Sequence, residues 1–336
     1  MKKVAINGVG RIGKLVLKSL IEHGFDGEIA LLNDPAGTPE QHAMWLEFDT
    51  IHGRWPGTFS YDADGVVING RHMRLTHSSK HSGLPLKDMK IDVVIDCSGV
   101  FNTPPKVQPF FDAGVTKVIA STPIRQAPAL NLVYGVNHDL YDADANDLVT
   151  ATSSTANSLG PVIKIIHEEL EIVHGSFTAI HNASNTQSIT NRPGKDARRS
   201  RSALTSLVPS GSSAARSIQQ IFPELSERLD GHTVRVPVLN TSLLDCVFEV
   251  THHTTTDELN ALFREYAEGP LRGVLGYEER PLVSADYLND PRSCIIDGLC
   301  TKDINETQVK VLAWFDNEWG YACRLADITR MVVKAL

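Results

Sequence analysis

The segment Ser153-Ser154-Thr155-Ala156-Asn157 places hydroxyl and amide side chains where a helix is expected to begin. The run 147–152 before it is typical of a strand, and the run 161–170 after it carries apolar residues at helical spacing. Small hydroxyl side chains often cap helices, and the first helical turn carries partial positive charge that favours anions and anionic nucleophiles. Ser154 is therefore a candidate for chemistry, although an ordinary Ser/Thr-rich N-cap would have the same composition.

A glycine motif near the N-terminus indicates a nucleotide-binding turn. A strand-like run at 2–6 leads into Gly8-Val9-Gly10-Arg11-Ile12-Gly13, and apolar residues at helical spacing follow. A second strand, 28–32, is followed by Asp34, about 20 residues beyond the motif, which is the spacing of the dinucleotide fingerprint. A glycine turn in another α/β unit is the alternative, but strand, helix and acidic residue together favour dinucleotide binding.

The residues of this motif have separate tasks in dinucleotide binding. Gly8 would make the tight turn, and Gly10 would let a pyrophosphate approach the start of the helix. Asp34 would accept hydrogen bonds from the free hydroxyls of the adenine ribose and would repel a 2′-phosphate. We therefore expect NAD to be preferred over NADP.

The first half of the chain predicts a mainly parallel sheet with an antiparallel insertion. Short alternating runs with hairpin signals occupy 57–79, and parallel strands resume at 91–96 and 116–120. The loops that contain Ser98 and Ser121 follow these two strands, at the carboxyl ends where open α/β sheets bind ligands. This half is expected to be a Rossmann domain.

The second half predicts a different architecture, an α+β domain with a mixed, largely antiparallel sheet. Strand-like runs with few helices between them lie at 176–181, 243–251 and 308–315. A helical pattern closes the chain at 319–336. The whole chain is thus expected to be an α/β protein with two domains.

Composition limits the class of protein. The chain has 336 residues, of which 42% are hydrophobic, and this length suits two domains. The formal net charge of −8 and the absence of a polybasic run argue against nucleic acids and membranes as partners. No run approaches the roughly 18 apolar residues of a membrane span. The five cysteines lack the spacing of disulfide or metal sites, so we expect a cytoplasmic protein without a metal.

Over its whole length the chain resembles the phosphorylating glyceraldehyde-3-phosphate dehydrogenases. The similarity runs in order through four signatures: the glycine motif, Phe48-Asp49-Thr50-Ile51-His52-Gly53-Arg54, the segment 153–157, and Trp314-Phe315-Asp316-Asn317-Glu318-Trp319-Gly320-Tyr321. The resemblance implies an NAD-binding domain at 1–152, on which a C-terminal helix, 318–336, packs back, and a catalytic domain at 153–317. It also implies a homotetramer.

The resemblance assigns roles to individual residues. Ser154 stands where the family places its catalytic cysteine, and His181 would be the general base and acid beside it. The implied cofactor-binding residues are Gly8, Gly10, Arg11, Ile12, Gly13, Asp34, Ser98, Gly99, Ser121, Asn317, which would bind the nicotinamide carboxamide, and Tyr321. The implied phosphate-binding residues are Ser153, Thr155, Arg199, Ser212 and Ser213 for inorganic phosphate, and Ser184 and Arg235 for the phosphate of the substrate. Ser184 and Ser212 replace a usual threonine, and Ser213 replaces a usual glycine.

The serine at position 154 changes the expected chemistry. The family attacks the aldehyde of glyceraldehyde 3-phosphate with a thiolate, passes a hydride to NAD, and transfers the acyl group to inorganic phosphate. A serine hydroxyl is far less acidic than a thiol, so this chain is expected to bind both ligands but to turn over very slowly. Ser154 either replaces the cysteine of an otherwise active enzyme or belongs naturally to a non-catalytic NAD-binding or interaction protein.

The acceptor and the aldose phosphate remain open at this level. Asn33-Asp34-Pro35-Ala36-Gly37 and His52-Gly53-Arg54-Trp55 are similar to the branch associated with arsenic-resistance operons, which makes arsenate an alternative to phosphate. Erythrose 4-phosphate is another substrate within the family.

Overall fold

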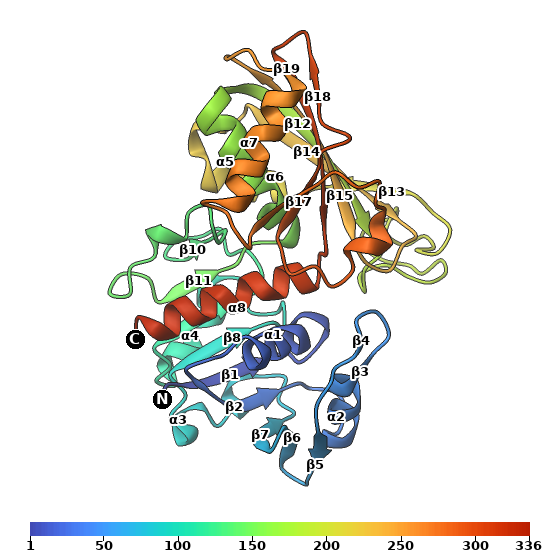
Figure 1. Ribbon diagram of the computed structural model, residues 1–336. Coiled ribbons are helices and arrows are strands. Elements are labelled where there is room, and N and C mark those ends of the chain that lie inside the picture. The colour runs from blue at the N-terminus through green and yellow to red at the C-terminus, as the bar shows by residue number, and fades with distance from the viewer. The chain divides into compact units, whose positions relative to one another are not determined.

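The computed structural model describes every residue of the chain, Met1–Leu336, as two compact units (Figure 1). The first unit comprises Met1–Tyr134, His138–Thr152 and Ala322–Leu336, and the second comprises Gly135–Asn137 and Ser153–Tyr321. Each unit has its own main sheet and its own hydrophobic core.

The first unit is built on a nine-stranded sheet, whose strands are β1 (Lys3–Asn7), β2 (Glu28–Asn33), β5 (Phe59–Tyr61), β6 (Gly65–Ile68), β7 (Arg71–Thr76), β8 (Val93–Asp96), β9 (Lys117–Ala120), β10 (Leu130–Asn131) and β11 (Leu148–Thr150). Their order is β10-β11-β9-β8-β1-β2-β7-β6-β5 (Figure 1). Neighbours from β10 to β7 run parallel, whereas β6 pairs antiparallel with both β7 and β5. The predicted parallel sheet with an antiparallel insertion is confirmed.

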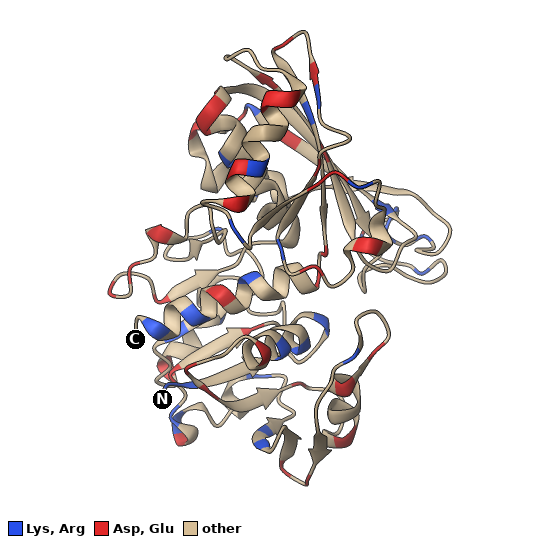
Figure 2. Cartoon of the chain, in the orientation of Figure 1, with Lys and Arg blue, Asp and Glu red and all other residues tan.

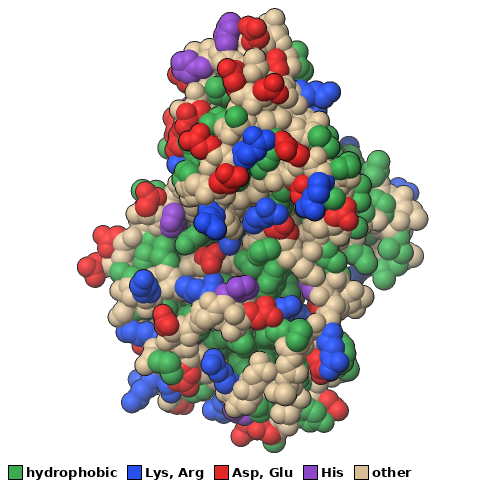
Figure 3. Space-filling view, in the orientation of Figure 1, with side chains coloured by type: hydrophobic (Ala, Val, Ile, Leu, Met, Phe, Trp, Pro, Cys, Tyr) green, Lys and Arg blue, Asp and Glu red, His purple; other side chains and the backbone are tan.

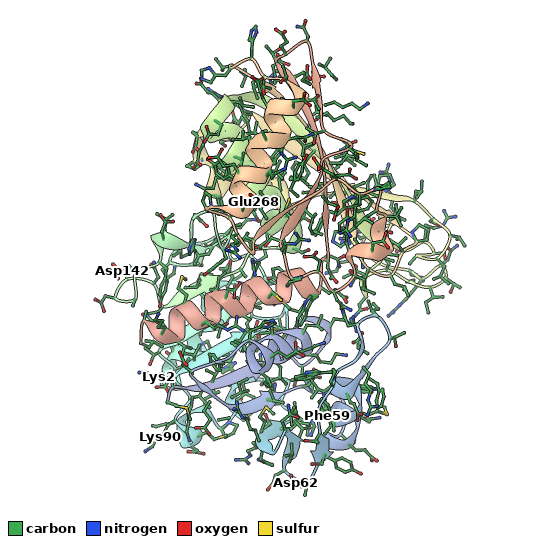
Figure 4. The ribbon with its side chains drawn as sticks, in the orientation of Figure 1. Lys2, Phe59, Asp62, Lys90, Asp142 and Glu268 are labelled. Atoms are coloured by element: carbon green, nitrogen blue, oxygen red, sulfur yellow. The ribbon has the colours of Figure 1, made fainter.

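A tight turn closes the antiparallel edge of this sheet. Asp62 accepts hydrogen bonds through Oδ1 from the amides of Asp64 and Gly65, both at 2.9 Å. Figure 4 shows Phe59 and Asp62 at this edge of the unit. A carboxylate that binds backbone amides within its own turn explains why this sequence signals a hairpin.

The helices of the first unit are α1 (Arg11–Glu22), α2 (Pro39–Glu47), α3 (Leu86–Met89), α4 (Pro104–Asp112) and, from Ala322 onward, α8 (Trp319–Lys334). The central strands are covered on both faces, since Val93, Val94 and Ile95 are fully buried. Arg330 of α8 donates hydrogen bonds to the carbonyl oxygens of Ser19 and Gly24, at 2.6 and 3.0 Å, and so ties the C-terminal helix to α1. A separate hairpin is formed by β3 (Phe48–Asp49) and β4 (Gly53–Arg54).

The second unit is built on an eight-stranded mixed sheet, whose strands are β12 (Ile172–Asn182), β13 (Val208–Gly211), β14 (Leu229–Val236), β15 (Ser242–Val250), β16 (Leu275–Glu278), β17 (Cys294–Asp297), β18 (Lys302–Ile304) and β19 (Gln308–Phe315). The order is β13-β14-β12-β15-β19-β17-β16, and β18 pairs with β19. The pairs β12/β14 and β16/β17 are parallel and the others are antiparallel, which confirms the predicted mixed sheet. The helices are α5 (Ser154–Leu170), α6 (Ser213–Ile221) and α7 (Thr256–Glu268).

Helix α5 begins earlier than the apolar pattern suggests. The apolar run predicts a helix over 161–170, but the helix starts at Ser154 and holds Pro161 in its interior. A proline inside a helix lacks the amide hydrogen of the i→i−4 bond, and its ring clashes with the carbonyl of residue i−4 and with the Cβ of the residue before it. Here the residue before it is Gly160, which has no Cβ, so the last of these clashes is absent. The first turn of α5 therefore consists of the small polar residues themselves.

Candidate active site

The glycine loop of the first unit fits a dinucleotide. Gly8 has φ +90°, and a Cβ at Gly8 would lie 2.7 Å from the amide nitrogen of Ser98. A Cβ at Gly13 would lie 1.9 Å from the carbonyl oxygen of Gly8, so the loop and α1 pack without side chains between them. At Gly10, the N-cap of α1, an added Cβ would meet nothing within 4 Å, and no side chain caps the helix. This open, uncapped helix start is suited to a pyrophosphate.

Asp34 follows β2 and is held in a fixed orientation. Its Oδ2 accepts a hydrogen bond from the amide of Val9 in the glycine loop, at 3.0 Å, and its Oδ1 accepts one from the amide of Ala36, also at 3.0 Å. Each oxygen keeps a further lone pair with which it could accept a hydrogen bond from a ribose hydroxyl. Asp34 is thus oriented beside the glycine loop before any ligand binds.

Polar side chains join the carboxyl ends of neighbouring strands beneath these loops. Asn7 of β1 donates to Asp96 of β8 at 2.7 Å, and Asn33 of β2 donates to Asn7 at 2.8 Å. Ser98 Oγ donates to the same Asp96 oxygen at 2.7 Å, and Thr76 of β7 donates to Asn33 at 2.9 Å. The sequence interpretation missed this network, because an isolated Asn or Asp at the end of a strand has no periodic signal. It fixes the positions from which the predicted cofactor loops start.

Two carboxylates near these loops have shifted pKa values. Burial raises the pKa of Asp96 to about 6, against the hydrogen bonds from Ser98 and Asn7, and its second oxygen has no partner. Burial alone would raise the pKa of Asp49 as well, but backbone amides and the side chains of Arg11 and Lys14 hold it well below its usual range. Asp49 therefore forms ion pairs with Arg11 and Lys14 on α1, so Arg11 is already neutralised by its own chain.

Ser154 of the second unit is the first residue of α5. The hydroxyl of Ser153 caps the helix by accepting a hydrogen bond from the amide of Ala156, at 3.2 Å, and Thr155 is buried. Ser154 is partly exposed, and its hydroxyl makes no hydrogen bond within the chain. The preceding Thr152 has φ +53°, a left-handed conformation that is strained for a β-branched residue. Such strain is often found at functional turns.

The chain path would bring His181 back toward this helix start. Helix α5 spans roughly 25 Å, the chain reverses at Glu171, and α5 packs against β12. The distance along β12 to His181 is roughly 30 Å, about the same as the helix. No hydrogen bond joins Ser154 to His181, although such bonds often form only when substrate binds.

His181 is a buried, neutral imidazole in contact with Arg235. The two residues are register partners in the β12–β14 pair, and Arg235 Nη1 lies 2.6 Å from His181 Nδ1. Burial, and then the charge of Arg235, lower the pKa of His181 to about 3. The ring also packs edge-on against Phe315 at 6.2 Å. At neutral pH His181 is therefore uncharged.

Arg235 is a half-buried cation without a carboxylate partner. Its hydrogen bonds go only to His181 and to the carbonyl oxygen of Asn182. Burial, together with the nearby charge of Arg199, lowers the pKa of Arg235 to about 10. Two guanidinium groups that repel each other without a bridging anion are the arrangement that a phosphate would stabilise.

The other predicted residues of this unit lie around the same end of the sheet or on helix starts. Asn317 is buried, and its Oδ1 accepts a hydrogen bond from Ser242 at 3.1 Å, which leaves its amide nitrogen to donate. Ser212 caps α6 through the amide of Ala214 at 3.2 Å, and Ser213 is the exposed first residue of α6. Ser184 Oγ is hydrogen-bonded to Thr186 Oγ1 at 2.9 Å, and Tyr321 is buried in α8.

Comparison with known proteins decides the family. Residues 2–104 match the family described as "Glyceraldehyde 3-phosphate dehydrogenase, NAD binding domain", and residues 153–317 match "Glyceraldehyde 3-phosphate dehydrogenase, C-terminal domain". The chain belongs to the glyceraldehyde-3-phosphate dehydrogenase family. It is 46% identical over 335 residues to glyceraldehyde-3-phosphate dehydrogenase 3 of Nostoc sp. (strain PCC 7120), and this covers 99% of both chains.

Other members of the glyceraldehyde-3-phosphate dehydrogenase family are similar over nearly the same length. The plasmid enzyme of Cupriavidus necator is 41% identical over 327 residues, which covers 97% of this chain and 96% of the relative. Glyceraldehyde-3-phosphate dehydrogenase 2 of Bacillus subtilis is 38% identical over 335 residues, which covers 99% and 97%. The predicted family and fold class are confirmed, and the protein is an NAD-dependent oxidoreductase of this family. None of its helices has the length and apolar character of a membrane span.

Proposed function

We propose that this protein is a glyceraldehyde-3-phosphate dehydrogenase in which Ser154 occupies the position of the catalytic nucleophile. Its substrates would be glyceraldehyde 3-phosphate and inorganic phosphate, with arsenate as an alternative acceptor. With Ser154 in place, it would bind NAD and the sugar phosphate but turn over slowly. The observation that carries this proposal is the half-buried Arg235, which has no carboxylate partner and contacts the neutral His181.

The proposed chemistry assigns a task to each of these residues. A nucleophile at position 154 would add to the aldehyde carbon. His181 would take up the proton that the nucleophile releases once Arg235 turns from its Nδ1 to the phosphate of the substrate, because the ring proton can then move to Nδ1 and leave Nε2 to accept. Arg235 and Ser184 would hold the phosphate of the substrate, and Ser153, Thr155, Arg199, Ser212 and Ser213 would hold inorganic phosphate. Bound NAD would accept the hydride from the substrate. The glycine loop, Asp34 and the loops at Ser98, Gly99 and Ser121 would hold the cofactor, and Asn317 would donate a hydrogen bond to its nicotinamide carboxamide. Phosphate would then displace the acyl group from position 154.

Serine makes two of these steps difficult. A thiol has an ordinary pKa of about 8.5, within reach of a helix start and an imidazole, whereas a serine hydroxyl needs a full Ser-His-acid arrangement. His181 has no carboxylate hydrogen-bonded to it, since its Nδ1 contacts only Asn182 and Arg235. An oxyester is also a poorer acyl donor to phosphate than a thioester. The geometry therefore supports binding more than turnover.

The test of this proposal is restoration of activity by Ser154→Cys. The cysteine variant is expected to produce NADH from glyceraldehyde 3-phosphate with phosphate or arsenate, with a gain of up to about 10⁶-fold, the size of the loss when a hydrolase nucleophile is removed. Ser154→Ala is the matched control, since it keeps the helix start but has no nucleophile. Calorimetric titration with NAD and with the sugar phosphate would confirm that all three proteins bind both ligands.

The result also separates the alternatives. A cysteine variant that binds both ligands but makes no NADH would favour a natural non-catalytic NAD-binding protein. The retention of His181, Arg235 and Asn317 argues against that alternative. The values of kcat/KM for glyceraldehyde 3-phosphate and erythrose 4-phosphate, each with phosphate and with arsenate, would identify the preferred aldose and acceptor.

A tetramer is part of the same proposal. Figure 2 shows blue Lys and Arg segments in the loops beside β13, and Figure 3 shows green hydrophobic side chains gathered over the same region. Three apolar residues of these loops, Ile189, Leu204 and Leu207, are 61 to 70% exposed. Exposed apolar side chains that lie together are typical of an interface. Sedimentation equilibrium would measure the assembly, and Leu207→Asp is expected to weaken it.

A further inference from the structure

A buried histidine supports the loop that carries Asp34. His42 lies on α2, just beyond this loop, and is only 2% exposed. Its Nε2 lies 2.8 Å from the carbonyl oxygen of Ala36, an exposed residue of the loop. Because a carbonyl can only accept, Nε2 must be the donor in this bond. The opposite ring nitrogen, Nδ1, is buried without a partner.

Ala36 links this histidine to the carboxylate of Asp34. The amide of Ala36 donates to Asp34 Oδ1 at 3.0 Å, while its carbonyl oxygen accepts from His42. The other oxygen, Asp34 Oδ2, accepts from the amide of Val9 at 3.0 Å. One of the two bonds that orient Asp34 therefore depends on a peptide group that His42 holds in place.

The loop passes directly over the imidazole at Gly37. This residue has φ +85°, and a Cβ added there would lie 2.8 Å from His42 Nε2 and 3.1 Å from the ring of Trp45. The rings of His42 and Trp45 themselves pack edge-on at 5.6 Å. Any shift of the imidazole would therefore move the loop, because no space separates them.

The start of α2 holds the other end of the loop. Thr38 caps the helix through a reciprocal pair of hydrogen bonds with Gln41, at 3.0 and 3.2 Å, and Pro39 follows in the first turn. The loop is thus anchored to β2 before Asp34 and to α2 after Gly37, and His42 hydrogen-bonds to Ala36 in its middle from outside the loop.

We propose that His42 is a positioning residue that sets the preference for NAD over NADP by fixing the loop from Asp34 to Gly37. The inference rests on the proposed role of Asp34 in binding the ribose hydroxyls, and it does not depend on the chemistry at position 154. A fixed carboxylate gains its full hydrogen bonds from free hydroxyls, which NAD has and NADP lacks at the 2′ position. Loosening the loop would therefore weaken NAD binding more than NADP binding.

The test compares His42→Leu with His42→Gln in the full-length protein. Leucine has a similar size but no donor, whereas the amide nitrogen of glutamine can reach the position of Nε2 and restore the bond to Ala36. By calorimetric titration, His42→Leu is expected to bind NAD about tenfold more weakly, the effect of one lost buried hydrogen bond, with NADP affinity changed by less than about threefold. His42→Gln is expected to recover most of the NAD affinity.

Further variants keep the test decisive. Asp34→Asn, measured in parallel, should lose the NAD preference with His42 intact; if it does not, Asp34 is not the ribose ligand and this inference fails with it. If His42→Leu does not fold, Gly37→Ala carries the test, because its methyl group would displace the loop from an intact imidazole. The proposal is overturned if the folded variants bind NAD like the parent, or if NAD and NADP weaken equally. The activity test with Ser154→Cys does not depend on these binding measurements, so it tests the proposed reaction whichever result they give.

Discussion

Arg235 Nη1 lies 2.6 Å from His181 Nδ1 and 3.2 Å from the carbonyl oxygen of Asn182. A guanidinium can only donate, so Nδ1 must accept and the imidazole carries its proton on Nε2. Nδ1 also lies 3.0 Å from the carbonyl oxygen of Asn182, to which it would donate if Arg235 moved away. Arg235 therefore selects the tautomer of His181.

Removal of this guanidinium is expected to reverse the tautomer. In Arg235→Ala, the proton should move to Nδ1 and bind Asn182, which frees the lone pair of Nε2. The pKa of His181 should rise, because the charge of Arg235 is its second cause of depression, but should stay below the ordinary value, because burial is the first. Nitrogen-15 spectra of the imidazole would report both changes.

Arg199→Ala is the control for this prediction. It removes a neighbouring guanidinium whose charge reaches Arg235 but whose side-chain contacts are with Ser210 and Asp196. The Nε2–H tautomer should persist in this variant. The same tautomer in Arg235→Ala as in the parent would contradict the assigned role of Arg235.

Acid should destabilise the protein through His181. Its pKa is about 3 in the folded chain and 6.5 as an ordinary value, so between these pH values the unfolded chain binds a proton that the folded chain does not. The free energy of unfolding should therefore fall as pH decreases from 6.5 toward 3, by up to about 1.4 kcal/mol per unit from this group. Urea unfolding at several pH values should show a shallower acid loss in His181→Gln. An identical slope in both proteins would exclude this contribution.

Asp96 should change the free energy of unfolding in the opposite direction as pH varies. Its folded pKa of about 6 is above the ordinary 3.8, so the unfolded chain releases its proton first and stability falls as pH rises between these values. Asp96→Asn keeps an acceptor for Asn7 and Ser98 but carries no charge. The variant should be more stable at pH 7 by roughly 1–3 kcal/mol, and this gain should vanish near pH 4. Chemical denaturation at both pH values would measure it, and a gain of equal size at pH 4 would point to packing instead of charge.

The sequence predicted features that depend on local pattern. The glycine motif with Asp34 has a fixed spacing, and the contrast between continuous apolar strands and alternating strands separated the two sheets. Helix α5 shows the limit of this approach, because its first turn contains no apolar periodicity and its proline follows a glycine at 160. The apolar pattern alone points to 161 as the start, whereas the helix begins at Ser154, capped by Ser153 and packed through the buried Ala156 and Leu159.

Buried polar contacts could not be predicted from pattern. His42, Asp96 and Ser242 are single polar residues in apolar or mixed surroundings, and each becomes meaningful only through a partner that is distant in the sequence or in a loop. The contact between Arg235 and His181 depends on the register of β12 and β14, which 53 intervening residues leave undetermined in the sequence. The family resemblance assigned roles to Arg235 and His181 but did not indicate that the two side chains touch.

Two glycines of the nucleotide loop allow packing and ligand binding to be separated. A methyl group at Gly13 would lie 1.9 Å from the carbonyl oxygen of Gly8, so Gly13→Ala should force α1 away from the loop and lower the stability of the protein by several kcal/mol. A methyl group at Gly10 meets nothing within 4 Å, and Gly10 has an extended backbone with φ −80° that alanine can adopt. Gly10→Ala should therefore cost less than about 1 kcal/mol, the difference between glycine and alanine as an N-cap.

The same Gly10→Ala variant should nevertheless lose NAD affinity. Its methyl group would fill the open space at the start of α1, where the pyrophosphate is expected to approach the backbone, so at least a tenfold weaker affinity is expected. Thermal unfolding and calorimetric titration with NAD would give both quantities for each variant. A Gly10→Ala protein that binds NAD like its parent would show that the pyrophosphate does not approach this residue.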